Sequence, residues 1–313
     1  GWMLAVGGGY REIVALLLQA NSDPNYGIAG LTPLMIAAAS GQVEVARMLV
    51  NCGASSTSVD QETGWTPLHR ASHRGHGGLV GLLIQTGTAV DAGDWKGQTP
   101  LMVAISAGHA DCARAILCSG ANLALSDDAG ENALIKCVTS ENEASRQEQC
   151  LELLLKAGAP VNAGAKATGE TPLLLAVKAG SDSMSRRLLQ FKANVNLANQ
   201  RKETPLMVAA EKGHATVAHL LLLGGADTTF QDLEGHTALM RAAAAGQVKV
   251  CTLALDFGSN PSTISPVDCE TPATLAAKHG HVDVYRMLVG AGGVVRSTEG
   301  NFTLRGSDTD GAS

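Results

Sequence analysis

The sequence predicts a mainly α-helical repeat solenoid in which short helix-turn-helix units stack on one another. Of its 313 residues, 36 are glycine and only 3% are aromatic, although 45% are hydrophobic. The apolar side chains are therefore mostly small or aliphatic, which suits thin layers of short helices better than one large core. In addition, a tripeptide recurs at a nearly constant spacing, as is typical of repeat proteins.

The recurring tripeptide is Thr-Pro-Leu, which occurs in full at 32–34, 66–68, 99–101, 171–173 and 204–206. Degenerate copies lie at 132–134, 237–239 and 271–273, and consecutive copies are 33 or 34 residues apart except for one step of 39. This period and tripeptide resemble the ankyrin repeat, whose signature contains T-P-L-H-x-A. The resemblance covers about residues 1–300. It implies an ankyrin-repeat solenoid of about nine repeats, with helix-turn-helix units joined by β-hairpin fingers.

Each element of a unit follows from its residues, as the fourth unit illustrates. Thr99 is a favourable N-cap, and the proline after it suits the first helical position. Gly108 is expected to end the first helix in the left-handed conformation. A second amphipathic helix is expected over 111–119, followed by Gly120 and a polar hairpin over 122–130. Helices this short are not stable alone in water, so stacking must stabilise them.

Glycine marks three places in the repeat: the hairpin turn, the end of the first helix and the end of the second. Twenty-one of the 36 glycines occupy them, with six, eight and seven at the respective places. Left-handed backbone, which glycine adopts readily, is expected at all of them. Lys202 and Cys269 stand at the hairpin place in two units, so those two turns are expected to be locally altered.

The predicted array spans residues 1–301 and starts with a partial repeat, in which Gly9 ends a first helix and 13–18 belong to a second. Because the hairpin before it is missing, further protein is expected upstream. Eight more repeats begin near Gly27, Gln61, Asp94, Asp127, Lys166, Asn199, Asp232 and Pro266. The fifth unit is irregular, with an insertion near 140–149 that predicts a longer loop or extended helix ends. This insertion is either a tolerated surface feature or a protrusion specific to a partner. Residues 302–313 form a polar tail that is expected to be disordered.

The bulk composition excludes several classes of function. A formal net charge of −6 provides no basic field for nucleic acid. No apolar run approaches the roughly 18 residues of a membrane-spanning helix, so membrane insertion is not expected. The seven cysteines contain no CxxC pair, which favours a reducing compartment and a cytoplasmic, or alternatively nuclear, location.

No catalytic, cofactor or metal site is predicted. His69, His73 and His76 lie close in sequence but lack the glutamate of an HExxH motif and any nearby cysteine or acidic ligand. Cysteines at apolar helix positions are expected to be buried, whereas Cys269 occupies a turn and is expected to be accessible. The buried set comprises Cys112, Cys137, Cys150 and Cys251.

His69 alone keeps the histidine of the family signature, and the resemblance implies that it links hairpin to helix by hydrogen bonds. Methionine takes that place in four other units, at 35, 102, 207 and 240. A soft binding stripe would explain this recurrence, but a methionine that fills an inner packing site explains it better.

The resemblance implies a non-catalytic protein-binding scaffold whose partner contacts the concave surface of fingers and first helices. Trp and Arg are enriched at binding hot spots, and two tryptophans fall on adjacent fingers, at expected solvent-facing tips. The candidate partner-binding residues are Trp65, Trp95, Arg70, His73, Arg74, Lys96 and Gln98. Two alternatives stay open: the indoles pack on neighbouring hairpins, or the repeats are the regulatory or targeting arm of a larger enzyme or channel. The array is expected to be monomeric or part of a larger assembly, with protein partners and no cofactor.

Overall fold

The computed structural model describes residues 1–296 and 302–303, which form eighteen helices and one two-stranded sheet. This confirms the predicted mainly helical repeat fold. The chain divides into two compact units, Gly1–Ala167 and Thr168–Ser313, which are described separately.

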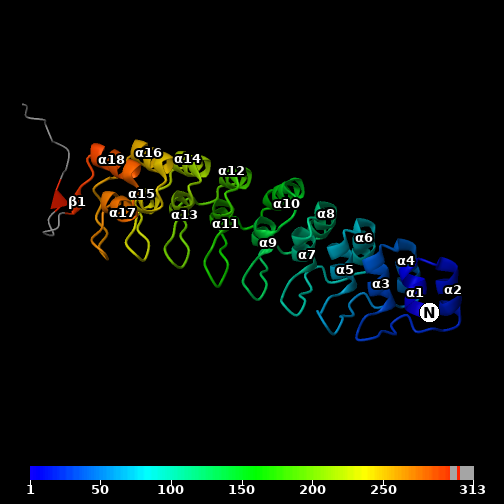
Figure 1. The fold of residues 1–313 in the computed structure, drawn as a ribbon. Helices are drawn as coiled ribbons and strands as arrows, with labels where there is room; N and C mark the ends of the chain where they lie inside the picture. The colour runs from blue at the N-terminus through cyan, green and yellow to red at the C-terminus, as the bar shows by residue number, and fades with distance from the viewer. Residues whose placement is uncertain (297–301, 304–313) are drawn as a thin grey trace, which may run out of the picture. The chain divides into compact units, whose positions relative to one another are not determined.

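In the first unit, the first helices of successive repeats pack side by side, and so do the second helices (Figure 1). The first helices are α1 (Trp2–Gly7), α3 (Pro33–Ser40), α5 (Pro67–Arg74), α7 (Pro100–Ser106) and α9 (Ala133–Thr139). The second helices are α2 (Arg11–Gln19), α4 (Val43–Asn51), α6 (Gly77–Gln85), α8 (Ala110–Cys118) and α10 (Ala144–Lys156).

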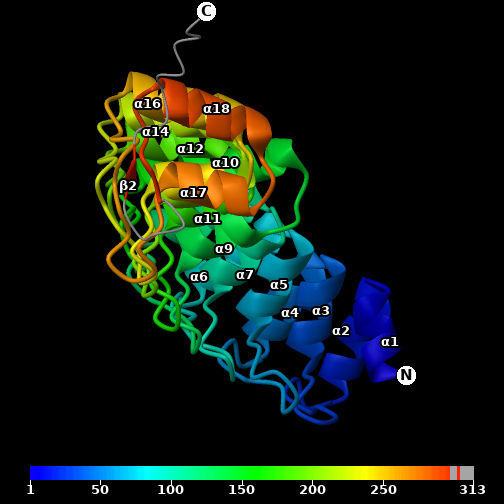
Figure 2. The same cartoon turned by 60° about the vertical axis from the view of Figure 1, so that its left-hand side comes forward.

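The second unit repeats this arrangement, and Figure 2 shows α17 beneath α18 in the same two-layer order. Its first helices are α11 (Pro172–Lys178), α13 (Pro205–Lys212), α15 (Ala238–Ala244) and α17 (Pro272–Lys278). Its second helices are α12 (Asp182–Gln190), α14 (Ala215–Leu223), α16 (Val248–Asp256) and α18 (Val282–Gly290). Strands β1 (Val295–Arg296) and β2 (Phe302–Thr303) pair antiparallel after α18. Of the predicted tail, the structure describes only β2; the rest of that prediction lies outside the described residues.

The first helices begin and the repeats turn as the sequence predicts. In every repeat from the second onward, a threonine or asparagine side chain accepts a hydrogen bond from the third helical N–H, for example Thr99 from Met102. All twenty-one glycines at the three recurring places have positive φ, from 68° to 88°. Lys202 and Cys269 also have positive φ, each 58°, so their turns keep the glycine geometry. The expectation that these two turns are altered was wrong, because the surrounding hairpin imposes the left-handed backbone.

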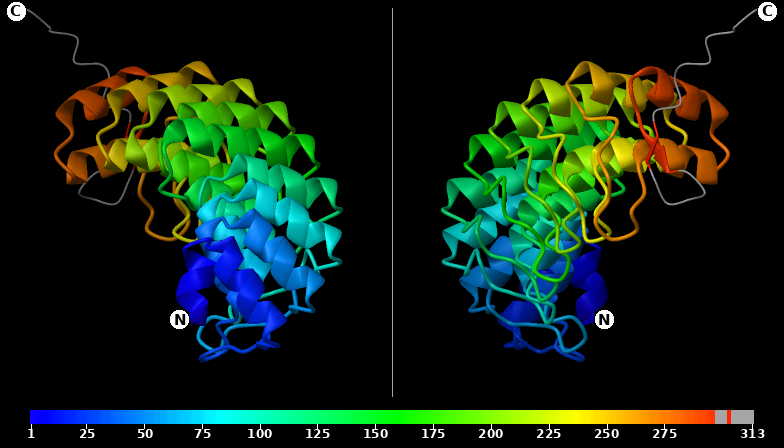
Figure 3. Two further views of the ribbon diagram at one scale, coloured as in Figure 1. Left: turned by 90° about the vertical axis from the view of Figure 1, so that its right-hand side faces the viewer. Right: turned by 90° about the vertical axis from the view of Figure 1, so that its left-hand side faces the viewer.

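Within each unit, the hairpin fingers leave the helices on one side (Figure 3). Neighbouring fingers are joined by backbone hydrogen bonds at matching positions. In the first unit, Trp95 N donates to Thr63 O at 3.0 Å, and Asp128 N donates to Lys96 O at 3.0 Å. In the second unit, Gln200 N donates to Thr168 O at 3.0 Å. The fingers are therefore held in register with one another.

The insertion in the fifth repeat lengthens the second helix, which has 13 residues in α10 and nine in α8. The missing glycine at the end of α9 is replaced by a side chain. The buried Gln147 amide donates to the carbonyl oxygens of Cys137 at 2.9 Å, Val138 at 3.3 Å and Ser140 at 3.0 Å. Of the two predicted forms, the structure therefore contains an extended helix, which also caps its neighbour.

The buried positions agree with the sequence predictions. The four repeated methionines are at most 2% exposed, which confirms that they are packing residues. Four cysteines are buried as expected and Cys269 is exposed, while Cys52 and Cys118 are also exposed. Burial raises the pKa of Cys112 and Cys150 to about 11, so their thiols are poor nucleophiles. Over the described residues, no helix has the length and apolar character needed to cross a bilayer.

Candidate functional site

Each finger starts at a finger-base residue, whose backbone N–H donates to the carbonyl of the residue just before the next helix N-cap. Seven described fingers have this hydrogen bond, with Ile28, Asp60, Asp94, Asp127, Asn199, Asp232 and Ser265 at the base. In the aspartate fingers, one carboxylate oxygen accepts hydrogen bonds from backbone N–H groups of the turn. Asp94 Oδ1, for example, accepts from Lys96 N and Gln98 N, both at 2.8 Å. The base residue thus closes the finger, and in the aspartate fingers the second carboxylate oxygen bonds a side chain elsewhere.

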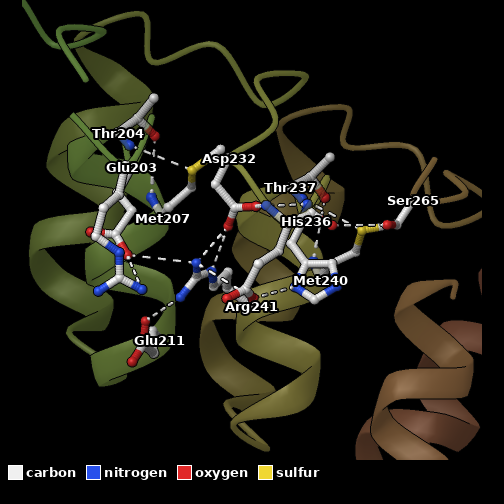
Figure 4. Close-up of polar contacts among 12 residues, drawn as sticks. Glu203, Thr204, Met207, Glu211, Asp232, His236, Thr237, Met240, Arg241 and Ser265 are labelled. Atoms are coloured by element: carbon white, nitrogen blue, oxygen red, sulfur yellow. Dashed lines mark hydrogen bonds and ion pairs between the residues drawn. The ribbon is translucent and has the colours of Figure 1, made fainter. Parts of the chain in front are cut away.

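In three repeats, that second oxygen binds a cation at helix position four, the fourth residue after the N-cap. Arg241 in α15 is the most enclosed example (Figure 4). Its guanidinium Nη2 lies 2.6 Å from Asp232 Oδ2, and Nη1 lies 2.9 Å from Glu211 Oε2. Burial alone would lower the pKa of Arg241, but these carboxylates outweigh it and raise the pKa. A single side chain therefore joins α15, its own finger and α13.

The first unit contains two further pairs of this kind. Arg70 Nη2 lies 3.0 Å from Asp60 Oδ2, and Lys136 Nζ lies 2.7 Å from Asp127 Oδ2. Burial would raise the pKa of Asp60, but hydrogen bonds from Thr63 and the charge of Arg70 hold it below its ordinary value. Both aspartates are almost completely buried, so their charges need these partners.

Asp94 departs from this pattern. Helix position four of its repeat is Val103, which carries no charge. Asp94 Oδ2 instead accepts a hydrogen bond from the indole Nε1 of Trp65 at 3.0 Å. Asp94 is also half-buried, whereas the other three base aspartates are buried. Within the described residues, it is the base aspartate that has no ion pair.

Trp65 does not lie at a finger tip, contrary to the sequence expectation. It directly precedes the N-cap of α5, and its half-buried ring lies against that helix. The ring centroid lies 5.1 Å from that of His73 and 5.7 Å from Arg70 Cζ. Together with the bond to Asp94 on the next finger, these contacts give Trp65 a packing role.

Trp95 follows Asp94 directly and is 60% exposed, as expected for a tip residue. Its ring lies over the backbone of the preceding finger, because a Cβ added to Gly64 would meet Trp95 Cδ2 at 2.7 Å. The neighbouring Lys96 is exposed, as are His73 and Arg74 at the end of α5. Over the described part of the chain, neither Lys96 nor Arg74 has an ion pair.

Gln98 and His69 tie the Asp94 finger to α5. His69 Nε2 donates to Gln98 O at 3.0 Å, and His69 Nδ1 accepts from Thr66 N at 3.2 Å. This is the link that the family resemblance implies. Burial lowers the pKa of His69 despite the nearby acceptor, so this ring is neutral near pH 7. Burial and the charge of Arg74 likewise lower the pKa of His73.

The candidate residues from the sequence thus fall into two groups. Trp65, Arg70, His73 and the Gln98 backbone are joined by contacts around α5 and the Asp94 finger. Trp95, Lys96 and Arg74 are exposed, and the described part of the chain shows no hydrogen bond, ion pair or ring contact among them. The finger-base aspartates were missed. Their signal was available, because an aspartate five or six residues before an N-cap recurs with a cation four residues after it.

One group among the described residues has metal-ligand chemistry. Ligand atoms of Asp232, Glu234 and His236 lie within 4.8 Å of one another. Arg241 Nη2 already lies 2.6 Å from Asp232 and 3.9 Å from Glu234. A guanidinium therefore occupies the place where a cation would be bound, and this group is a salt-bridge network (Figure 4).

A family model described as ankyrin repeats in three copies matches residues 2–60, 52–127, 79–165, 134–232 and 216–298. The chain belongs to the ankyrin-repeat family. Several curated ankyrin-repeat proteins are similar to parts of it. The ankyrin repeat and KH domain-containing protein mask-1 of Caenorhabditis elegans is 37% identical over 116 residues, which are 36% of this chain and 4% of that protein. Human Rabankyrin-5 is 34% identical over 170 residues, which are 53% of this chain and 14% of that protein.

A solved ankyrin-repeat structure is also similar. The ankyrin repeat domain of Bcl-3, described as a unique member of the IkappaB protein family, matches with a TM-score of 0.66 and 30% identity. The match covers 73% of this chain and all of that domain. By contrast, the ankyrin-repeat chain spans only a small part of the length of the mask-1 and Rabankyrin-5 proteins.

Proposed function

We propose that this ankyrin-repeat chain is a non-catalytic scaffold that binds a protein partner on its finger and first-helix surface. Ankyrin repeats generally mediate protein–protein interaction, and the relatives above carry the same repeats. The observation that carries the choice of surface is Trp95. Trp95 is 60% exposed, yet its backbone is held by the hydrogen bond to Thr63 and its ring lies against Gly64 of the preceding finger.

An exposed and positioned indole provides contact area at low entropic cost when a partner binds. The surface we propose comprises Trp95, Lys96 on the same finger, and the exposed His73 and Arg74 at the end of α5. Trp65 contacts Arg70 and Asp94, and the Gln98 carbonyl accepts a hydrogen bond from His69, so these residues keep the finger and α5 in place. This proposal assigns contact to the first set of residues and positioning to the second.

Affinity purification followed by binding measurements on the partners recovered tests this function. Trp95→Ala is expected to weaken binding about tenfold or more, as for a hot-spot residue. Leu233→Ala is the matched control, because Leu233 has the same finger position in the second unit and is 58% exposed. Equal binding by wild type and Trp95→Ala would refute the proposed surface, provided that both proteins melt at the same temperature.

A second candidate is that the repeats are the regulatory or targeting arm of a larger protein. The lengths of the relatives favour it, because mask-1 and Rabankyrin-5 extend far beyond the matched region. The sequence of the complete transcript decides between the two candidates. An additional catalytic or channel domain in the same open reading frame would support the second.

A further inference from the structure

The charge of the finger-base residue and the residue at helix position four vary together. Asp94 is the exception to this relation. Where the base is aspartate, position four is a cation in three repeats: Asp60 with Arg70, Asp127 with Lys136, and Asp232 with Arg241. Where the base is neutral, position four is aliphatic: Asn199 with Val208, and Ser265 with Leu275. Asp94 with Val103 combines a charged base with an aliphatic position four.

The hydrogen bond from Trp65 does not replace the missing cation. An indole N–H is a neutral donor, so it satisfies one lone pair of Asp94 Oδ2 but leaves the negative charge uncompensated. An unpaired carboxylate that is partly removed from water costs free energy, and a cation would recover it. Because Asp94 is only half-buried, a cation from outside the chain can reach it.

The surroundings of Asp94 fit a basic side chain in particular. The half-buried ring of Trp65 contacts Asp94 from one finger, and the exposed ring of Trp95 follows Asp94 on the next. Indole faces attract guanidinium and ammonium groups, and Trp65 already has Arg70 Cζ at 5.7 Å. Asp94 therefore offers an ion pair, and the exposed indole of Trp95 on the same finger offers a cation–π contact.

From these contacts we infer that Asp94 and Trp95 form a subsite for one arginine or lysine side chain of a protein partner, with Trp65 holding the Asp94 carboxylate in place. This inference rests on the proposed function and specifies its partner. The partner's cation would pair with Asp94 as the helix cation does in three other repeats, because the fourth repeat has Val103 at helix position four. Lys96 is an exposed cation on the same finger, Arg74 is exposed at the end of α5, and Arg70 is engaged by Asp60. The partner segment consequently carries a single basic side chain for Asp94 and is not basic overall.

A random peptide library displayed on phage and selected on the wild-type protein tests this inference. The enriched peptides are expected to share one Arg or Lys, and its replacement by Gln is expected to weaken binding about tenfold or more. Asp94→Asn is expected to cause a similar loss. Its turn should survive, because Asn199 accepts the equivalent backbone hydrogen bonds from Arg201 and Glu203. The matched control is Asp128→Asn, an exposed carboxylate on the next finger, with less than about a twofold change expected.

A second variant separates binding from folding. Val103→Arg supplies the position-four cation from within the chain, so it is expected to keep the thermal midpoint while it weakens the selected peptides about tenfold. Peptides that lack a common basic residue, or that bind the Asp94→Asn protein as well as wild type, would overturn the subsite. If Trp95→Ala still weakens binding of the selected peptides in that case, the proposed partner-binding function stands without the subsite at Asp94. If no peptide is enriched, or if none responds to either residue, both proposals fall.

Discussion

Replacement of Arg241 by leucine is expected to destabilise the protein by about 3 kcal/mol. Arg241 and Asp232 side chains are 14% and 1% exposed, so the pair is largely removed from water. The substitution leaves Asp232 with the two backbone hydrogen bonds from Glu234 and His236 but with no counterion. Loss of one partner from a buried ion pair typically costs about 3–5 kcal/mol, and the remaining bonds place this case at the lower end.

The chain itself contains the compensating change. In the seventh repeat, neutral Asn199 stands at the finger base and Val208 at helix position four. The double variant Arg241→Leu with Asp232→Asn reproduces that combination, so it is expected to lose only about 1 kcal/mol. The double variant should therefore be more stable than Arg241→Leu alone, although it contains one more substitution.

Urea unfolding followed by circular dichroism measures these free energies. Amide hydrogen exchange in α15 shows whether the loss is local to that repeat. The control is Arg201→Leu, whose side chain is 67% exposed and lies 3.6 Å from Glu203; a change below about 1 kcal/mol is expected there. If Arg241→Leu costs no more than this control, or if Asp232→Asn fails to restore stability, the ion pair does not have the role argued from its burial.

Two further predictions concern single side chains in the first unit. Burial lowers the pKa of His69 below 6.5, so on acidification the unfolded chain takes up a proton before the folded chain does. The neutral His69 ring therefore contributes to the free energy of unfolding above about pH 6.5, and this contribution is lost as the pH falls toward the folded-state pKa. His69→Met, the residue found at this place in four other repeats, should therefore lose less stability between pH 7.5 and 5.5 than wild type, and equal losses would contradict this account. Gln147→Ala removes three hydrogen bonds from the end of α9 and should cost about 1–3 kcal/mol in urea unfolding. The exposed Gln149→Ala should change stability by less than about 0.5 kcal/mol, and similar costs for both would refute the capping role.

Much of the fold could be predicted because its signals are local. A threonine N-cap followed by proline starts a helix whatever its surroundings, and glycine at positive φ ends it, so the repeat register and helix order followed directly. Lys202 and Cys269 show the limit of this local reading. Their side chains disfavour positive φ, yet both hairpins impose it.

The two tryptophans show which part of the candidate site needed the structure. Trp95 follows a finger base, whereas Trp65 stands just before an N-cap, and both belong to similar polar hairpins. A large side chain before an N-cap commonly packs on the fourth helical residue, as Trp65 does on Arg70. That rule could have identified Trp65 as a packing residue. Its bond to Asp94 could not have been found in this way, because it joins residues 29 positions apart on different fingers.

By itself, therefore, the sequence determined the family, the period, the order of the helices and the left-handed backbone at the recurring glycines, since each depends on residues close together in the chain. Only the tertiary structure decided which exposed groups have partners. Stacking brings the finger base of one repeat against the indole of another, and it leaves Asp94 as a base aspartate without a cation. An aspartate without a counterion indicates a binding site only when its spatial neighbours are known. Packing between repeats determines those neighbours.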